Sequence, residues 1–300
     1  MNSPKFLQKN DTVAIVATAR KITLEEITPA INLLKQWGLK VVIGNSIGLE
    51  EHQFAGSDHE RTADLQKMLD DTAVKAIWFA RGGYGTVRII DDLDFTQFKK
   101  KPKWLIGYSD ITVIHNHVHT FGIATVHATM PLDITNSTKE AIQSLKNSLF
   151  GNAISYEIPT SNLHKSGAAE GILVGGNLSI LYSLLGSSSS LNTNGKILFI
   201  EDLDEYLYHI DRMLQNLKRN GYFDHLKGLI VGSMTKMHDN AIPFGKSAHE
   251  IIFDAVSPFN FPVVFDFPAG HIDDNRALIF GEKIVLNVND SKTFLTFITN

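Results

Sequence analysis

The chain has 300 residues, of which 43% are hydrophobic and 20% are charged. This composition supplies enough apolar material for a large core and excludes a chain that is disordered throughout. The formal net charge is -4, so a surface that binds the phosphates of a nucleic acid is not expected. The sequence contains no cysteine, which excludes disulfides, thiolate metal sites and a cysteine nucleophile.

The length predicts one large domain or two modest ones. No apolar run approaches the roughly 20 residues of a membrane span, so no membrane partner is expected. The residues before Thr12 lack the apolar stretch of a secretory signal. We therefore expect a soluble cytoplasmic protein.

The first half of the chain alternates short apolar runs with segments of helical periodicity. Strands are expected at residues 12–17, 39–43, 75–80, 103–107 and 123–126. A helix is expected between Thr23 and Gly38, where Thr23 and Glu26 resemble a capping box, and further helices are expected at 58–69 and at 110–121. This order predicts an α/β domain over residues 1–150, with a parallel sheet covered by helices on both faces.

The pattern changes after Phe150. Residues 151–170 contain serine and proline without a long periodicity, and they are expected to form a linker. Strands follow at 171–176, 196–200, 228–231, 263–265, 284–288 and 294–298, with helices from 177 and at 206–220. Strands outweigh helices here, which predicts a β-rich mixed domain over residues 171–300.

Ser109 stands directly between an apolar strand and a helix. A serine at such a turn can present its hydroxyl above the edge of the sheet, with the next backbone N–H facing an oxyanion. Only half of the G-x-S-x-G pattern is present, because Ile111 stands in place of the second glycine. The alternative is that Ser109 only caps the following helix.

The segment Arg81-Gly82-Gly83-Tyr84-Gly85 also joins a strand to a helix. Its glycines let the backbone turn sharply and expose N–H groups to an anion. The segment is neither G-x-G-x-x-G nor a phosphate-binding Walker loop, so nucleotide binding receives little support. It is either an oxyanion loop or a tight turn without a function.

Three further positions carry polar side chains that could do chemistry. His115 and His119 are four residues apart on a predicted helix, but no carboxylate ligand accompanies them, so no metal is expected. Glu201 lies at the end of a strand, where it could also only favour the next helix. His271 lies in a loop bounded by proline and glycine, and functional groups concentrate in such loops.

Ser109, Glu201 and His271 follow each other in the order of the α/β-hydrolase triads. The same triad occurs in several chain orders, so the order alone does not identify the chemistry. It does make acyl transfer by an activated serine one hypothesis for this chain.

Taken together, these segments resemble the serine LD-carboxypeptidase family of bacterial cell-wall recycling and the related microcin C self-immunity peptidases. The resemblance runs over essentially the whole chain. It is carried by the segments Asp11–Ala17, Arg81–Gly85, Gly107–Asp110, Gly175–Ser179, Glu201-Asp202 and Gly270-His271 with Asn275.

The resemblance implies a role for each of these strand-end residues. Ser109 would be the nucleophile, His271 the general base, and Glu201 the acid that orients the histidine. The backbone N–H groups of Asp110 and Gly83 would form the oxyanion hole. The triad would then lie in a cleft between the two domains.

The resemblance also implies the substrate and the cofactors. Arg81, Gly82 and Tyr84 would contact a murein-derived peptide, from which a terminal D-alanine is released. Three arginines beside the proposed site loops are candidate partners of the substrate's terminal carboxylate, and the sequence does not rank them: Arg20, Arg81 and Arg276. Neither a metal nor an organic cofactor is implied, and a homodimer is expected.

The chain departs from the family pattern at three places. Thr18-Ala19-Arg20 replaces a Pro-Ser type of turn, Ala128-Thr129 replaces Gly-Pro, and Ile279 replaces a proline. The first two departures could reshape the substrate pocket. Two alternatives therefore stay open: a self-immunity peptidase that cleaves aminoacyl sulfamoyl-adenylates, and a binding protein without catalysis.

Overall fold

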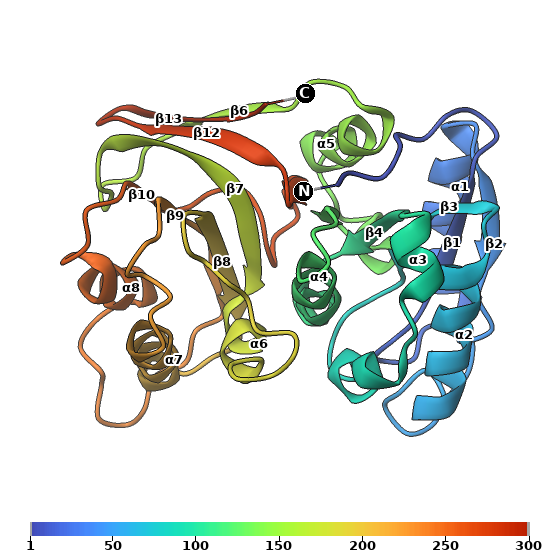
Figure 1. Ribbon diagram of the computed structural model, residues 1–300. Helices are drawn as coiled ribbons and strands as arrows, with labels where there is room; N and C mark the ends of the chain where they lie inside the picture. Colours follow the sequence, from blue (N-terminus) through green and yellow to red (C-terminus); the bar gives the residue numbers. More distant parts are fainter. Residues whose placement is uncertain (1, 299–300) are drawn as a thin grey trace.

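The computed structural model describes residues 2–298 and contains two β-sheets, which lie side by side in Figure 1. The N-terminal sheet has six strands in the order β11-β5-β4-β3-β1-β2. These strands are β1 (Thr12–Val16), β2 (Lys40–Ile43), β3 (Val74–Phe79), β4 (Trp104–Gly107), β5 (Thr125–His127) and β11 (Leu278–Phe280). The mixed α/β class expected from the sequence is confirmed.

Helices cover both faces of the N-terminal sheet. They are α1 (Leu24–Gln36), α2 (Asp58–Asp70), α3 (Thr96–Lys100), α4 (Thr112–His119) and α5 (Lys139–Phe150). Alternate residues of β3 point to opposite faces, so Trp78 packs with α1 and α5, and Phe79 packs with α2, α3 and α4. Helix α1 begins where the sequence predicts, because Thr23 and Glu26 form a capping box.

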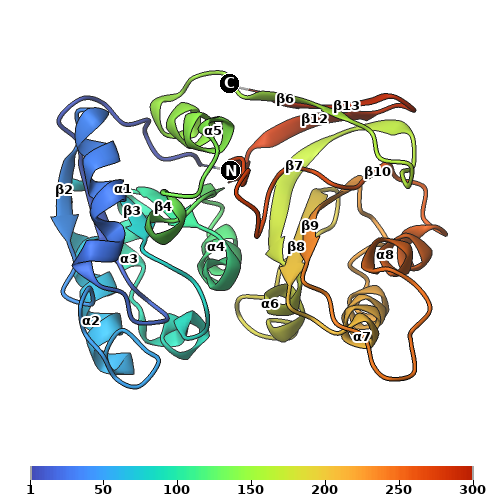
Figure 2. The ribbon, with the colours of Figure 1, turned by 180° about the vertical axis from the view of Figure 1, so that it is seen from behind.

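The C-terminal sheet has seven strands in the order β10-β9-β8-β7-β12-β13-β6. The strands are β6 (Ser155–Pro159), β7 (Gly167–Asn177), β8 (Ile197–Leu203), β9 (Gly228–Thr235), β10 (Val263–Val264), β12 (Lys283–Val288) and β13 (Lys292–Phe297). Helices α6 (Leu178–Ser183), α7 (Leu207–Arg219) and α8 (Ala248–Val256) cover one face, as Figure 2 shows from behind. The opposite face of β8 belongs to the same core as the N-terminal sheet.

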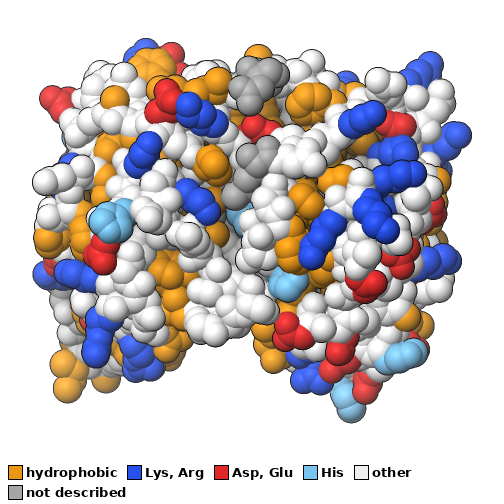
Figure 3. All heavy atoms as spheres, in the orientation of Figure 1, with side chains coloured by type: hydrophobic (Ala, Val, Ile, Leu, Met, Phe, Trp, Pro, Cys, Tyr) orange, Lys and Arg blue, Asp and Glu red, His pale blue; other side chains and the backbone are white. Residues whose placement is uncertain are grey.

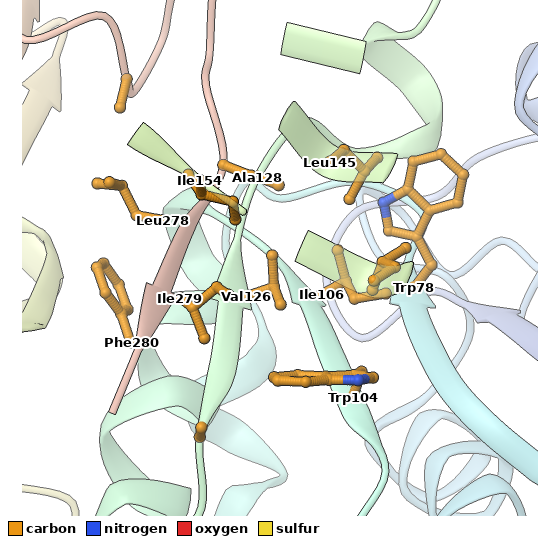
Figure 4. Packing of buried hydrophobic residues seen from close by; sticks show 14 of the residues in the cluster. Trp78, Trp104, Ile106, Val126, Ala128, Leu145, Ile154, Leu278, Ile279 and Phe280 are labelled. Atoms are coloured by element: carbon orange, nitrogen blue, oxygen red, sulfur yellow. The ribbon is translucent and has the colours of Figure 1, made fainter. Parts of the chain in front are cut away.

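The N-terminal sheet is mostly parallel, as expected, but it carries one antiparallel strand at its edge. Strand β11 comes from the C-terminal part of the chain and pairs antiparallel with β5. All three of its residues, Leu278–Phe280, are buried, and Figure 4 shows them beside Val126 in the core. A run of three apolar residues carries no periodicity, so the sequence could not assign this strand to its sheet.

Residues 151–170 also differ from the structureless linker that we expected. They contain β6 and the first residues of β7, and β6 pairs antiparallel with β13 at the edge of the C-terminal sheet. Tyr156 of β6 is buried, and its hydroxyl donates a hydrogen bond of 2.6 Å to the carbonyl of Ala277. Exposed and buried residues alternate along β6, as expected for a strand of an antiparallel sheet that has one face in the core and the other in solvent.

The space-filling view shows an outline that is indented at its lower edge, between the two halves (Figure 3). Among residues 2–298, no helix combines the length and the apolar character that crossing a bilayer requires.

Candidate active site

Ser109 lies in a short 3₁₀ turn, Ser109–Ile111, between β4 and α4. Its φ of 61° lies in the left-handed region, which a residue with a side chain rarely adopts. A serine on such a sharp strand-to-helix turn exposes its hydroxyl, as in the nucleophile elbow. Tyr108 is the N-cap of this turn and Ile111 is the N-cap of α4, so Ser109 does not act as the helix cap that was the alternative.

His271 and Glu201 lie next to Ser109, although they come from the C-terminal half of the chain. The Nε2 atom of His271 is 3.1 Å from Oγ of Ser109, and its Nδ1 atom is 2.7 Å from Oε2 of Glu201. Glu201 is fully buried on β8, and the side chain of His271 is 13% exposed. The acid therefore faces a histidine that solvent and a substrate can still reach.

The charges around His271 favour its protonated form. Burial opposes protonation, but the carboxylate of Glu201 outweighs it through its charge and its hydrogen bond, so the pKa of His271 is raised. Asp202 and Asp133 act in the same direction. The pKa of Asp202 is itself raised to about 7, mainly by burial and then by the charge of Glu201.

The glycine loop lies against the serine turn. A Cβ at Gly82 would lie 3.0 Å from Cβ of Ser109, so a larger residue here would require the serine turn to shift by a few tenths of an ångström. Asp110 ties the two segments together, because its buried carboxylate accepts a hydrogen bond of 2.9 Å from the N–H of Thr86. The sequence suggested a role only for the backbone of Asp110 and missed this contact of its side chain.

A cavity of about 530 Å³ opens at these groups. Its lining includes the expected residues Arg81, Gly82, Gly83, Ser109, Asp110 and His271. Arg20 adds a second positive charge, and the acidic residues Asp133, Asp202, Asp204 and Glu205 also line the cavity.

Two residues that the sequence placed near the substrate do not line this cavity. Tyr84 is 46% exposed, and its ring lies 6.2 Å from that of Phe54, at a tilt of 49°. Arg276 forms an ion pair with Asp274 and lines a different hollow. Of the three arginines considered for a substrate carboxylate, Arg20 and Arg81 remain.

The histidines of α4 are part of the core. His115 and His119 are buried, and burial lowers their pKa values to about 4 and about 3. His115 Nε2 lies 2.9 Å from the carbonyl of Gly107, and both rings pack edge-on against Phe280. Within residues 2–298, no three His, Asp or Glu side chains form a group that could hold a metal ion.

The raised pKa of His271 predicts the pH dependence of a reaction in which this histidine is the general base. A general base must be neutral, and protonation removes it as the pH falls through its pKa. The acidic limb of kcat/KM is therefore expected above the usual histidine value of about 6.5. Initial rates between pH 5 and pH 9 measure this limb, and a limb well below pH 6 would contradict the assignment of His271.

Comparisons with known proteins identify the family to which both halves of the chain belong. The family model of the LD-carboxypeptidase N-terminal domain matches residues 13–128, and that of the C-terminal domain matches residues 170–286. The chain is 36% identical over 296 residues to a probable murein peptide carboxypeptidase of Bacillus subtilis (strain 168). That alignment covers 95% of this chain and 91% of the relative.

Solved structures share the whole fold. The muramoyltetrapeptide carboxypeptidase of Oxalobacter formigenes superposes with a TM-score of 0.87 at 27% identity, covering 96% of this chain and 99% of its own. The microcin C7 self-immunity protein with aspartyl sulfamoyl adenosine gives a TM-score of 0.86 at 22% identity and covers 98% of both chains, which shows a common fold alone. Since the two family models span most of the sequence and the Bacillus relative aligns over nearly its full length, the chain belongs to the LD-carboxypeptidase family of hydrolases.

Proposed function

We propose that this chain is a serine carboxypeptidase that releases the terminal D-alanine from murein tetrapeptides. The observation that carries the proposal is the continuous contact from Ser109 through His271 to Glu201, at a cavity large enough for a short peptide. The substrate class is supported by the relatives that are named as murein peptide and muramoyltetrapeptide carboxypeptidases.

The reaction begins with a proton transfer from Ser109 to His271. As Nε2 of His271 takes the proton, Oγ of Ser109 bonds to the carbonyl carbon of the L–D peptide bond. The buried carboxylate of Glu201 accepts the Nδ1–H of the ring, which fixes the tautomer and stabilises the imidazolium.

The tetrahedral intermediate carries its negative charge on the former carbonyl oxygen. We assign the backbone N–H groups of Asp110 and Gly83 as its donors, since both residues line the cavity beside Ser109. Collapse breaks the C–N bond, and the leaving D-alanine amine takes the proton from His271. Water then attacks the acyl ester, gives its proton to His271, and the tripeptide leaves as Ser109 regains its hydrogen.

We propose that Arg81 binds the terminal carboxylate of the substrate, with Arg20 beside it on the cavity wall. The guanidinium of Arg81 is held by a hydrogen bond of 3.0 Å to the carbonyl of Lys21, so its direction is fixed before a peptide binds. Without such a partner, a substrate carboxylate would be desolvated in the cavity, and no ionic contact would offset the free energy that this costs.

Amidation of the terminal carboxylate is expected to cost about 2 kcal/mol, or roughly 30-fold in kcat/KM, because a charge-assisted contact is lost. Arg81→Gln should lower kcat/KM for the free acid by a similar factor and change that for the amide little. Steady-state rates on both peptides measure the coupling. A variant that loses both activities equally would show that Arg81 does not contact this carboxylate.

A panel of substrates tests the function itself. Mass measurement of the products should show loss of one alanine from the tetrapeptide and slow cleavage of the D–D bond of the pentapeptide. A tetrapeptide that ends in L-alanine should also be poor, because the methyl group would point into the cavity wall. Preferential hydrolysis of an aspartyl sulfamoyl adenosine would favour the self-immunity alternative, and no hydrolysis of any substrate would favour a binding protein.

We also propose, from the family resemblance, that the enzyme acts without a metal or organic cofactor, as a homodimer in the cytoplasm. Loss of activity on dialysis against EDTA would contradict the absence of a metal. A monomer in sedimentation velocity would contradict the homodimer.

A further inference from the structure

The residues of the proposed triad belong to two different sheets. Ser109 follows β4 of the N-terminal sheet, whereas Glu201 lies on β8 of the C-terminal sheet and His271 lies beyond β10. A shift of one sheet relative to the other would therefore change the contact of 3.1 Å between Ser109 and His271. Displacements of about 1 Å at a reacting group can cost 100-fold in rate.

One buried hydrogen bond joins the two sheets next to the triad. The backbone N–H of Asn177, the last residue of β7, donates to Oγ1 of Thr112 at 3.0 Å. Thr112 is the first residue of α4, one residue beyond the turn that carries Ser109. Both Thr112 and Asn177 are nearly inaccessible, with 0% and 3% exposure.

The approach of β7 to α4 is possible because Gly176 precedes Asn177. Gly176 has a φ of 140°, and a Cβ at this position would overlap the side chain of Thr112. Only glycine combines this backbone conformation with so close a contact. The end of β7 therefore packs directly against the first turn of α4.

The side chain of Asn177 continues the connection to the acid of the triad. Its Nδ2 donates to Oε1 of Glu201 at 3.3 Å and to Oδ1 of Asp202 at 2.9 Å. Its Oδ1 accepts from the N–H of Ile180 at 3.2 Å, which fixes the orientation of the amide. Asn177 and Glu201 are also paired neighbours in the parallel ladder of β7 and β8.

We propose that Thr112 and Asn177 are positioning residues. They keep Ser109, which follows the N-terminal sheet, aligned with Glu201 and His271 of the C-terminal half. The path runs from the turn of Ser109 to Thr112, through Asn177, to Oε1 of Glu201. Oε2 of the same carboxylate holds His271. Neither Thr112 nor Asn177 exchanges a proton with the substrate in this role. The proposal rests on the serine mechanism proposed above.

Thr112→Val tests the hydrogen bond between Thr112 and Asn177, because valine keeps the shape of the side chain and removes the oxygen that accepts from the N–H of Asn177. We expect kcat on the tetrapeptide to fall by about 10- to 100-fold, with KM within about threefold of the wild type. The rate at which a fluorophosphonate labels Ser109 should fall in parallel, since it reports the alignment of serine and histidine without peptide binding. Thr112→Ser retains the acceptor and should recover most of the loss.

A matched control separates this role from the general loss of a buried hydroxyl. Thr193 is 5% exposed, and its hydroxyl donates a hydrogen bond of 2.7 Å to the carbonyl of Tyr222, outside the lining of the catalytic cavity. Thr193→Val should change thermal stability but leave kcat and the labelling rate unchanged. A folded Thr112→Val enzyme with wild-type kcat and labelling would overturn the proposal.

Asn177→Ser gives a second test that keeps the helix cap and the backbone N–H. Serine still caps α6 but is too short to reach Glu201, so kcat and labelling should again fall. Normal rates in this variant, or loss of folding in both variants, would contradict a positioning role. A wild-type chain that releases no D-alanine and is not labelled would instead overturn the proposed function.

Discussion

Ser109→Ala is expected to lower turnover of the murein tetrapeptide by about 10⁴-fold or more, because the acyl-enzyme cannot form. The expectation rests on the position of Ser109 in the lining of the cavity and on its contact of 3.1 Å with His271. Since the two residues act as a unit, His271→Ala should cost about as much, and the double variant should be little worse than either single one. Release of D-alanine under single-turnover conditions measures all three variants.

Ser155→Ala is the matched control for this series, because Ser155 is an exposed serine of β6 that pairs with Thr296 at the edge of the sheet. It should retain wild-type turnover. If Ser109→Ala keeps more than about a tenth of the wild-type rate, another group is the nucleophile.

Glu201→Gln is expected to lower turnover on the order of 10³-fold. The amide keeps the size of the carboxylate but removes the charge that stabilises the imidazolium, and its NH₂ group can favour the wrong tautomer of His271. The pKa of His271 should fall, because the charge of Glu201 raises it in the wild type. The acidic limb of the pH profile should therefore move to lower pH.

The control for this change is Glu157→Gln, since Glu157 is an exposed residue of β6 that forms a surface ion pair with Lys292. Its kcat and pH profile are expected to equal those of the wild type. If Glu201→Gln kept the wild-type profile, Glu201 would not be the partner of the catalytic base.

The sequence predicted the elements that carry the site better than it predicted their assembly. Ser109 follows an apolar run, so its place just after β4 could be inferred from local pattern. Glu201 lies within β8 rather than at its end, and His271 lies in the loop after β10. The capping box at Thr23 and Glu26 likewise depends on neighbours in the sequence and appears where it was expected. Local pattern does not record which sheet a strand joins.

The features that were missed depend on contacts between distant segments. Strand β11 crosses to the N-terminal sheet, and its three apolar residues contain no pattern that predicts its pairing with β5. The bond between Thr112 and Asn177 joins residues 65 positions apart. Gly175-Gly176-Asn177 was visible only as a motif, because the need for glycine comes from the side chain of Thr112 across the interface.

The distribution of charge over the cavity could not be derived from the sequence either. Arg20, Arg81 and Arg276 all lie beside loops of the site, and only the fold separates the two that line the cavity from the one that pairs with Asp274. Asp202 was visible as a neighbour of Glu201, but its pKa of about 7 results from burial in the folded protein.

The most direct test of the catalytic centre is covalent labelling with a fluorophosphonate, followed by peptide mapping. We expect a single adduct on Ser109, with labelling slowed by saturating murein tetrapeptide and abolished in His271→Ala, which has no base to activate the hydroxyl. An adduct on another residue, or labelling of Ser109 that neither the tetrapeptide nor the loss of His271 affects, would contradict this expectation.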